Sequence, residues 1–119
     1  MQAVVPAIRI KSYEASRLFY GALGFVEQWT HQFGPGFPVF ASVAREGMEV
    51  FLTEHIGDCE FGALIHFNVQ SVDTLFGEFE RGGVVVADPP NNGIGPNVRS
   101  MVVQDPDGNR LKFLTVKRA

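Results

Sequence analysis

Cysteine occurs only once in the 119 residues, at Cys59, which excludes an internal disulfide framework and a zinc site built from several cysteines. No uninterrupted apolar stretch approaches the roughly 20 residues that a membrane-spanning helix needs. The first residues also lack the basic segment followed by an apolar run that marks a secretory signal peptide. We therefore expect a cytoplasmic protein that does not enter a membrane.

Neither sign of charge is in large excess, because 13 Asp and Glu residues against 10 Lys and Arg residues give a formal net charge of −3. A chain that holds nucleic acid through its phosphates is typically basic, so we expect no nucleic-acid partner. Apolar residues make up 45% of the chain and charged residues 19%, and these values exclude a disordered protein. We therefore expect residues 1–119 to form a single globular domain.

Tryptophan and tyrosine are scarce, with one and two copies, whereas phenylalanine occurs 11 times. Because aromatic rings bury a large apolar area, we expect most of these phenylalanines in the hydrophobic core. The others are candidates to line a pocket for a flat ligand. The segment 29–40 (WTHQFGPGFPVF) gathers four aromatic rings around glycines and prolines, and we predict that it forms the rim of such a pocket.

The chain is organised as a duplication. Each half contains an apolar helical face that begins at a serine and ends at a glycine twelve residues later, Ser12 to Gly24 and Ser71 to Gly83. The apolar patterns and turn residues predict four strands around each helix. The predicted strands are residues 4–10, 25–31, 39–44 and 48–53 in the first half, and 63–70, 84–87, 98–104 and 111–116 in the second. Residues 88–96 (DPPNNGIGP) are predicted to be a loop because proline, glycine and asparagine dominate them.

We therefore predict an α+β fold of two tandem β-α-β-β-β modules, with module one at about residues 3–56 and module two at about residues 63–117. A single helix covers only one face of a small sheet. Pairing the two curved mixed sheets would leave a groove lined by alternate strand residues. That groove is where we expect the functional site.

Three motifs in the chain resemble hallmarks of the vicinal oxygen chelate superfamily, which includes glyoxalase I, extradiol dioxygenases and bleomycin-resistance proteins. They are SRLFYGALGF at residues 16–25, VQSVD at 69–73 and DPDGNRL at 105–111. The resemblance runs from about Val4 to Val116, and it implies the same paired β-α-β-β-β fold. Fold alone does not choose among the activities of the superfamily.

Metal-dependent members of the superfamily carry one ligand on the first strand and one on the last strand of each module. Counting from the motifs maps these positions onto Val5, Phe51, Leu64 and Lys112. None of these residues offers an imidazole, a carboxylate or a thiolate, and the lysine ammonium repels a cation. We therefore predict that the protein has no metal site, no cofactor and no catalytic residues.

The chain is most similar to the metal-free, bleomycin-resistance-like branch. This resemblance implies a homodimer that confers antibiotic resistance by sequestering a planar, amphipathic ligand, such as a cationic antibiotic, at the dimer interface without turnover. Phe40 matches a stacking residue of that branch. The branch often carries Trp-Gly-Arg before the seventh strand, where this chain has Asn97-Val98-Arg99, so the resemblance does not name bleomycin itself as the ligand.

The predicted ligand-binding residues come from the aromatic rim, from the vacated metal positions and from strand residues that share their face. They are Trp29, Phe33, Phe37, Phe40, Glu49, Phe51, His66, Asn68, Arg99 and Lys112.

Two other functions stay open at this point. The first is a metal-dependent enzyme of the glyoxalase or dioxygenase type, with ligands relocated among Glu49, Glu54, His55 and His66. The second is a dimeric scaffold that binds no small molecule, for which the groove would be collapsed.

Overall fold

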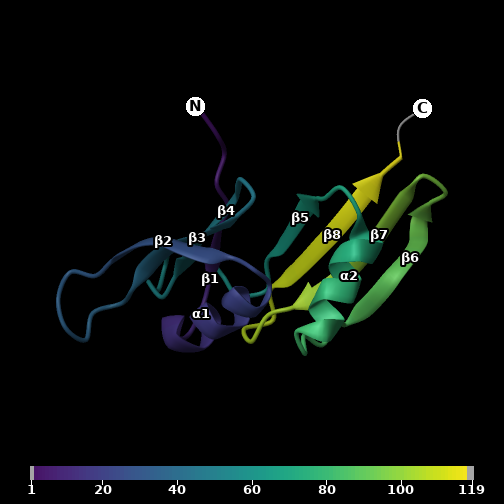
Figure 1. Ribbon diagram of the computed structural model, residues 1–119. Coiled ribbons are helices and arrows are strands. Elements are labelled where there is room, and N and C mark those ends of the chain that lie inside the picture. Colours follow the sequence, from purple (N-terminus) through teal and green to yellow (C-terminus); the bar gives the residue numbers. More distant parts are fainter. Residues whose placement is uncertain (1, 118–119) are drawn as a thin grey trace. The chain divides into compact units, whose positions relative to one another are not determined.

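The computed structural model describes residues 2–117, which form two compact units (Figure 1). Unit 1 comprises the chain up to Ala63 together with Pro106–Asn109. Unit 2 comprises Leu64–Asp105 and the chain from Arg110 onward. Among residues 2–117, no helix combines the length and the apolar character needed to cross a membrane.

Unit 1 is a four-stranded mixed sheet with one helix. Its elements are β1 (Ala7–Arg9), α1 (Tyr13–Ala22), β2 (Val26–His31), β3 (Phe40–Arg45) and β4 (Met48–Thr53). The strand order is β1-β4-β3-β2, in which β1 runs parallel to β4 and the other pairs are antiparallel.

Unit 2 repeats this topology. Its elements are β5 (Leu64–Asn68), α2 (Val72–Arg81), β6 (Asp88–Gly95), β7 (Val98–Gln104) and β8 (Arg110–Val116). The strand order is β5-β8-β7-β6, again with one parallel pair, β5 and β8. The predicted α+β fold of two β-α-β-β-β modules is confirmed.

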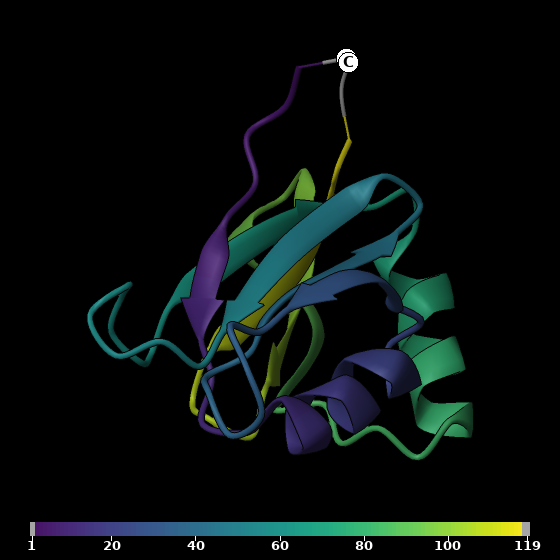
Figure 2. The same ribbon diagram turned by 90° about the vertical axis from the view of Figure 1, so that its left-hand side faces the viewer.

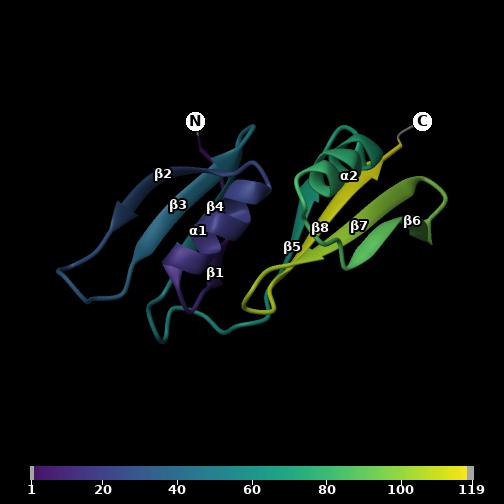
Figure 3. The same ribbon diagram turned by 60° about the horizontal axis from the view of Figure 1, so that its bottom comes forward.

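Serine caps start both helices, as the sequence predicts. The Ser12 hydroxyl accepts a hydrogen bond from the Ala15 amide at 3.3 Å, and the Ser71 hydroxyl accepts one from the Thr74 amide at 3.2 Å. Gly24 follows α1 with a φ of 89°, a left-handed conformation that suits glycine. Each helix lies against one face of its own sheet, as the views in Figure 2 and Figure 3 show for α1 and α2.

The core of each unit lies between its helix and its sheet. In unit 1 the inward side chains of the central strands are buried, among them Val50 and Leu52 of β4. In unit 2 three phenylalanine rings meet: Phe67 stacks on Phe113 at 4.9 Å between centroids, and Phe79 meets Phe113 edge-on at 5.5 Å. We call the sheet face opposite the helix the helix-free face of each unit.

The prediction for residues 84–96 is wrong. Residues 84–87 form no strand, and the segment predicted as a loop contains β6. β6 pairs irregularly with β7, with register shifts on both sides of Asn91. It lies at the edge of the sheet, where the missing N–H groups of Pro89 and Pro90 are tolerated. The first strand is also shorter than predicted, at Ala7–Arg9.

Candidate functional site

The helix-free face of unit 1 is defined by strand alternation and register. Phe51 on β4 lies between Ala7 on β1 and Ser42 on β3, and Ser42 lies opposite Trp29 on β2. Because paired residues share a face of the sheet, these four side chains form one row across the whole sheet. A second row runs beside it and consists of Arg9, Thr53, Phe40 and His31.

A β-bulge determines on which face of the sheet the Trp29 side chain lies. Glu27 pairs with Val43, whereas Trp29 pairs with Ser42, so the register shifts by one residue between them. Glu27 therefore faces α1, where its carboxylate accepts a hydrogen bond from the Tyr13 hydroxyl at 2.5 Å. Trp29 turns to the helix-free face.

Three rings from the two rows form an aromatic cluster of Trp29, Phe40 and Phe51. Trp29 and Phe40 are stacked, with planes 11° apart and centroids at 5.9 Å. Phe51 is inclined by 53° to Trp29 and by 55° to Phe40, at 5.4 Å and 5.3 Å. The Trp29 side chain is nevertheless 44% exposed, and the two phenylalanines are half-buried. The structure thus brings together three of the predicted ligand-binding residues.

Glu49 adds a negative charge to the same face. It precedes Phe51 by two residues on β4, and its carboxylate accepts a hydrogen bond from the Ser42 hydroxyl at 2.5 Å. Ser42 is fully buried, and Glu49 is half-buried. Ser42 is not among the predicted ligand-binding residues, although the alternation along β3 places it on the face of Phe40.

The loop between β2 and β3 carries the other two predicted rings. Phe33 is 74% exposed and meets His31 and His55 edge-on, with centroids 4.7 Å and 6.2 Å away. Phe37 is 57% exposed, and its carbonyl accepts a hydrogen bond from the Gln32 side chain at 2.6 Å. Phe33 therefore packs with histidines beside the aromatic cluster, on the side where His31 pairs with Phe40.

His66, Asn68 and Lys112 lie in unit 2. His66 and Asn68 alternate along β5 with the buried Ile65 and Phe67, so they lie on the helix-free face of that unit. Lys112 on β8 is the direct partner of His66 and shares this face.

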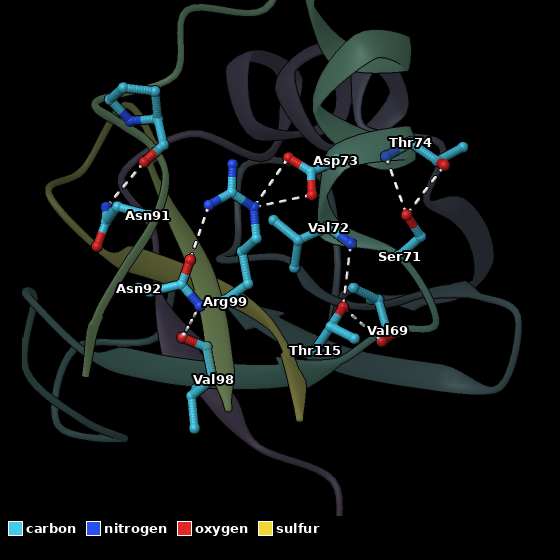
Figure 4. A network of polar contacts seen from close by, with 11 residues as sticks. Val69, Ser71, Val72, Asp73, Thr74, Asn91, Asn92, Val98, Arg99 and Thr115 are labelled. Atoms are coloured by element: carbon cyan, nitrogen blue, oxygen red, sulfur yellow. Dashed lines mark hydrogen bonds and ion pairs between the residues drawn. The ribbon is translucent and has the colours of Figure 1, made fainter. Parts of the chain in front are cut away.

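Arg99 lies on the other face of the unit 2 sheet, toward α2 (Figure 4). Its Nε donates to both carboxylate oxygens of Asp73 in the first turn of α2, at 3.0 Å and 2.8 Å. Its Nη1 donates to the Asn92 side chain at 2.9 Å. The hydrogen bond with Asp73 raises the pKa of Arg99. The structure therefore separates Arg99 from His66, Asn68 and Lys112.

Glu54 is one of the residues that could bind the metal ion of the alternative, metal-dependent enzyme. Its carboxylate accepts hydrogen bonds from two backbone amides. Its Oε2 accepts from the Tyr13 amide at 2.7 Å and its Oε1 accepts from the Val39 amide at 2.8 Å. The carboxylate therefore joins the start of α1 to the segment that leads into β3. Within the described residues 2–117, no group of three or more His, Cys, Asp or Glu side chains is arranged to hold a metal ion.

The chain belongs to a family of glyoxalase superfamily proteins, whose family model matches residues 1–119. A search of curated protein sequences gives no match.

Solved structures share the fold over nearly the whole chain. A bleomycin resistance determinant encoded on the transposon Tn5 is 15% identical, with a TM-score of 0.78 and coverage of 99% of this chain and 100% of that one. A bleomycin-binding protein complexed with bleomycin is 14% identical, with a TM-score of 0.75 and coverage of 98% and 100%. The antibiotic-binding protein TnmS3 from Streptomyces sp. CB03234 is 22% identical, with a TM-score of 0.77 and coverage of 98% of both chains. At these identities the similarity establishes the shared fold.

Proposed function

We propose that this protein binds a planar, amphipathic small molecule on the aromatic cluster and holds it without chemical turnover. The observation that carries the proposal is the exposure of Trp29 within a cluster of three mutually contacting rings. An exposed ring platform gains contact area when a flat molecule stacks on it. Phe33 and Phe37, which are both exposed on the neighbouring loop, are proposed to form the rim.

The similar folds support an antibiotic as the natural ligand. Two of the similar structures are described as bleomycin-resistance or bleomycin-binding proteins, and a third as an antibiotic-binding protein. The Glu49 carboxylate beside the rings favours a ligand that carries a positive charge. The corresponding role in the cell would be antibiotic resistance by sequestration, in a cytoplasmic homodimer.

Trp29 provides the means to test the proposal, because it is the only tryptophan in the sequence. Bleomycin and the planar cation N-methylquinolinium should change its fluorescence saturably, and calorimetry should give the same affinities. The Phe40→Ala variant should lose roughly 1–3 kcal/mol of binding free energy, because one ring of the platform is gone.

The matched control is Phe76→Ala, which removes another half-buried ring, but from α2 in unit 2. It should bind both probes as the wild type does. The proposal is wrong if neither probe binds, or if Phe40→Ala binds as tightly as the wild type while its melting temperature falls sharply. In the latter case Phe40 is a core residue.

Turnover is tested separately by mass spectrometry of the bound probe after incubation with and without added divalent metal ions. The proposal expects the probe to be recovered unchanged in both conditions. A product that forms only with the metal would instead support a metal-dependent enzyme with relocated ligands.

A further inference from the structure

Glu54 and Thr115 occupy equivalent positions in the two modules, seven residues after the glycine of the last hairpin. Each side chain accepts a hydrogen bond from the first backbone amide of the helix in its own unit. Glu54 accepts from Tyr13 at 2.7 Å, and Thr115 accepts from Val72 at 3.0 Å. Figure 4 shows this contact in unit 2. The duplicated modules therefore share one contact at this position, although the side chains differ.

The second contact of this side chain differs between the units. The Thr115 hydroxyl donates to the carbonyl of Val69, close to the start of α2, at 3.0 Å. Glu54 has a second oxygen instead, and this oxygen accepts from the Val39 amide at 2.8 Å. The backbone amide of Glu54 also donates to the Val39 carbonyl at 2.9 Å. Glu54 thus holds Val39 through both its backbone and its side chain.

Val39 ends the β2–β3 loop, residues 32–39, which carries both rim rings of the proposed site. At the start of this loop, the Gln32 side chain donates to the Phe37 carbonyl at 2.6 Å, so this hydrogen bond lies inside the loop. The contact with Glu54 is of a different kind. It fixes the end of the loop to the first turn of α1, which belongs to the folded body of unit 1.

Glu54 acts from the side of the sheet opposite to the aromatic cluster. Thr53 pairs with Phe40 and shares its helix-free face, so the next side chain along the chain points toward α1. A carboxylate suits this place, because the free amides at the start of a helix carry partial positive charge. Hydrogen bonds from amides to a carboxylate are also stronger than those to a neutral acceptor. Glu54 therefore influences the rings through the backbone of the loop.

We propose that Glu54 is a positioning residue, which holds the β2–β3 loop so that Phe33 and Phe37 are in place before a ligand binds. This inference rests on the proposed function, because it concerns the rim of the same site. A loop that is already ordered loses less conformational entropy when the ligand arrives. Loss of the Glu54 contact should therefore weaken binding, although every ring is still present.

The variant Glu54→Gln tests the proposal, because glutamine keeps one acceptor oxygen and turns an NH2 group toward the second amide. In the ligand-free protein, NMR relaxation should show lower backbone order in residues 32–39. The Val39 amide should exchange faster with solvent. Calorimetry with N-methylquinolinium should show about fivefold weaker binding.

Thr115→Val is the matched control, since it removes the equivalent contact with the helix start in unit 2. It should leave the order of residues 32–39 unchanged and alter the affinity by less than about twofold. Equal losses of affinity in the two variants would show that Glu54 only stabilises the fold, and would overturn the proposal. Unchanged loop order in Glu54→Gln would overturn it as well. If circular dichroism shows that Glu54→Gln is unfolded, Glu54→Asp decides by the same criteria, because it keeps the charge and shortens the reach.

A failure of the proposed function gives a different result from a failure of this inference. In the first case the wild type binds neither bleomycin nor N-methylquinolinium, and the role of Glu54 in binding is wrong together with the proposed function. In the second case the wild type binds a probe and Glu54→Gln binds it equally tightly. Only the role of Glu54 is then wrong.

Discussion

At the scale of single residues, Glu49 sets the charge next to the aromatic cluster. The buried Ser42 hydroxyl holds its carboxylate, and Ser42 lies in the row between Trp29 and Phe51. Partial burial reduces the screening of this charge by water and salt. A ring that carries a positive charge should therefore bind better than the same ring without it.

The prediction compares N-methylquinolinium with quinoline, which has the same two rings and is neutral at neutral pH. Glu49→Gln keeps an oxygen that can accept from Ser42 and removes only the charge. Affinity for the cation should fall by about fivefold, while affinity for quinoline stays unchanged. Calorimetry measures both, and Glu14→Gln on the exposed surface of α1 is the control for net charge. An equal loss for both compounds would contradict a role of the charge.

Tyr13 is a second residue whose environment has a measurable consequence. The pKa of Tyr13 is raised far above that of an exposed tyrosine. Burial of its side chain is the larger cause, and its hydrogen bond to Glu27 is the second. The folded state therefore retains a proton that the unfolded chain releases above about pH 10. Because the unfolded state then binds fewer protons, the protein loses stability as the pH rises.

Chemical denaturation at a series of alkaline pH values tests this expectation. The free energy of unfolding should be independent of Tyr13 ionisation below about pH 10 and should then fall by up to about 1.4 kcal/mol per pH unit. Tyr13→Phe should show a shallower fall, because it has no proton to release. If the wild type and Tyr13→Phe have identical slopes, Tyr13 ionises at its ordinary pH.

At the scale of elements, the turn between β7 and β8 ties unit 1 together. Asn109 in this turn is fully buried, and its Oδ1 accepts from the amides of Gly62 at 3.1 Å and Ala63 at 3.0 Å. Its Nδ2 donates to the carbonyl of Arg9 at 2.9 Å. One side chain thus provides hydrogen-bond partners for backbone groups at the end of β1 and in the segment before β5.

Asn109→Ala should be strongly destabilising, because it leaves buried backbone groups without partners. We expect a loss of about 2–4 kcal/mol in the free energy of unfolding, measured by urea denaturation. Asn97→Ala is the control, since Asn97 is exposed at the turn before β7. A loss below about 0.5 kcal/mol for Asn109→Ala would show that water replaces these hydrogen bonds.

The helices and most strands could be predicted because their signals are local. Ser12 and Ser71 mark helix starts through bonds to residues three positions along, so the sequence around them contains the evidence. β6 could not be predicted, since it exists only through pairing with β7, and its prolines and glycines are typical of loops. The β-branched residues 84–86 form no strand in the structure.

For the candidate site, too, the local sequence pattern predicts some features, whereas others depend on how the strands pair. Alternation along β4 and β5 suffices to place Phe51, His66 and Asn68 on helix-free faces. The face of Trp29 depends on the bulge after Glu27, and that of Arg99 on the register of β7, neither of which the pattern reveals. The contacts among the three rings likewise arise from strands that are distant in sequence.

At the scale of the whole molecule, the exposed edge of unit 1 bears on the proposed dimer. β2 is an edge strand, and all six of its residues are exposed, including the apolar Val26 at 63%. An uncovered edge of this kind can pair with a second chain. Sedimentation should therefore give twice the 13.1 kDa of one chain at micromolar concentration.

Val26→Lys should shift this equilibrium toward the monomer, because a charge on an edge strand opposes pairing. The control is Val85→Lys, which alters a residue that is 85% exposed in unit 2. The dimer is ruled out if the wild-type protein sediments as a monomer. If the wild type is a dimer and Val26→Lys leaves the monomer–dimer equilibrium unchanged, the dimer forms through another surface.

The side chain of Asn109 also links folding to synthesis on the ribosome. The chain emerges from its N-terminus, and domains generally fold in that order. The partners of Asn109 in unit 1 emerge first, yet their hydrogen bonds form only after residue 109 has been made, 46 residues beyond Ala63. Ribosome-bound chains that end before residue 109 should therefore be more sensitive to protease in the first half than chains extended past it.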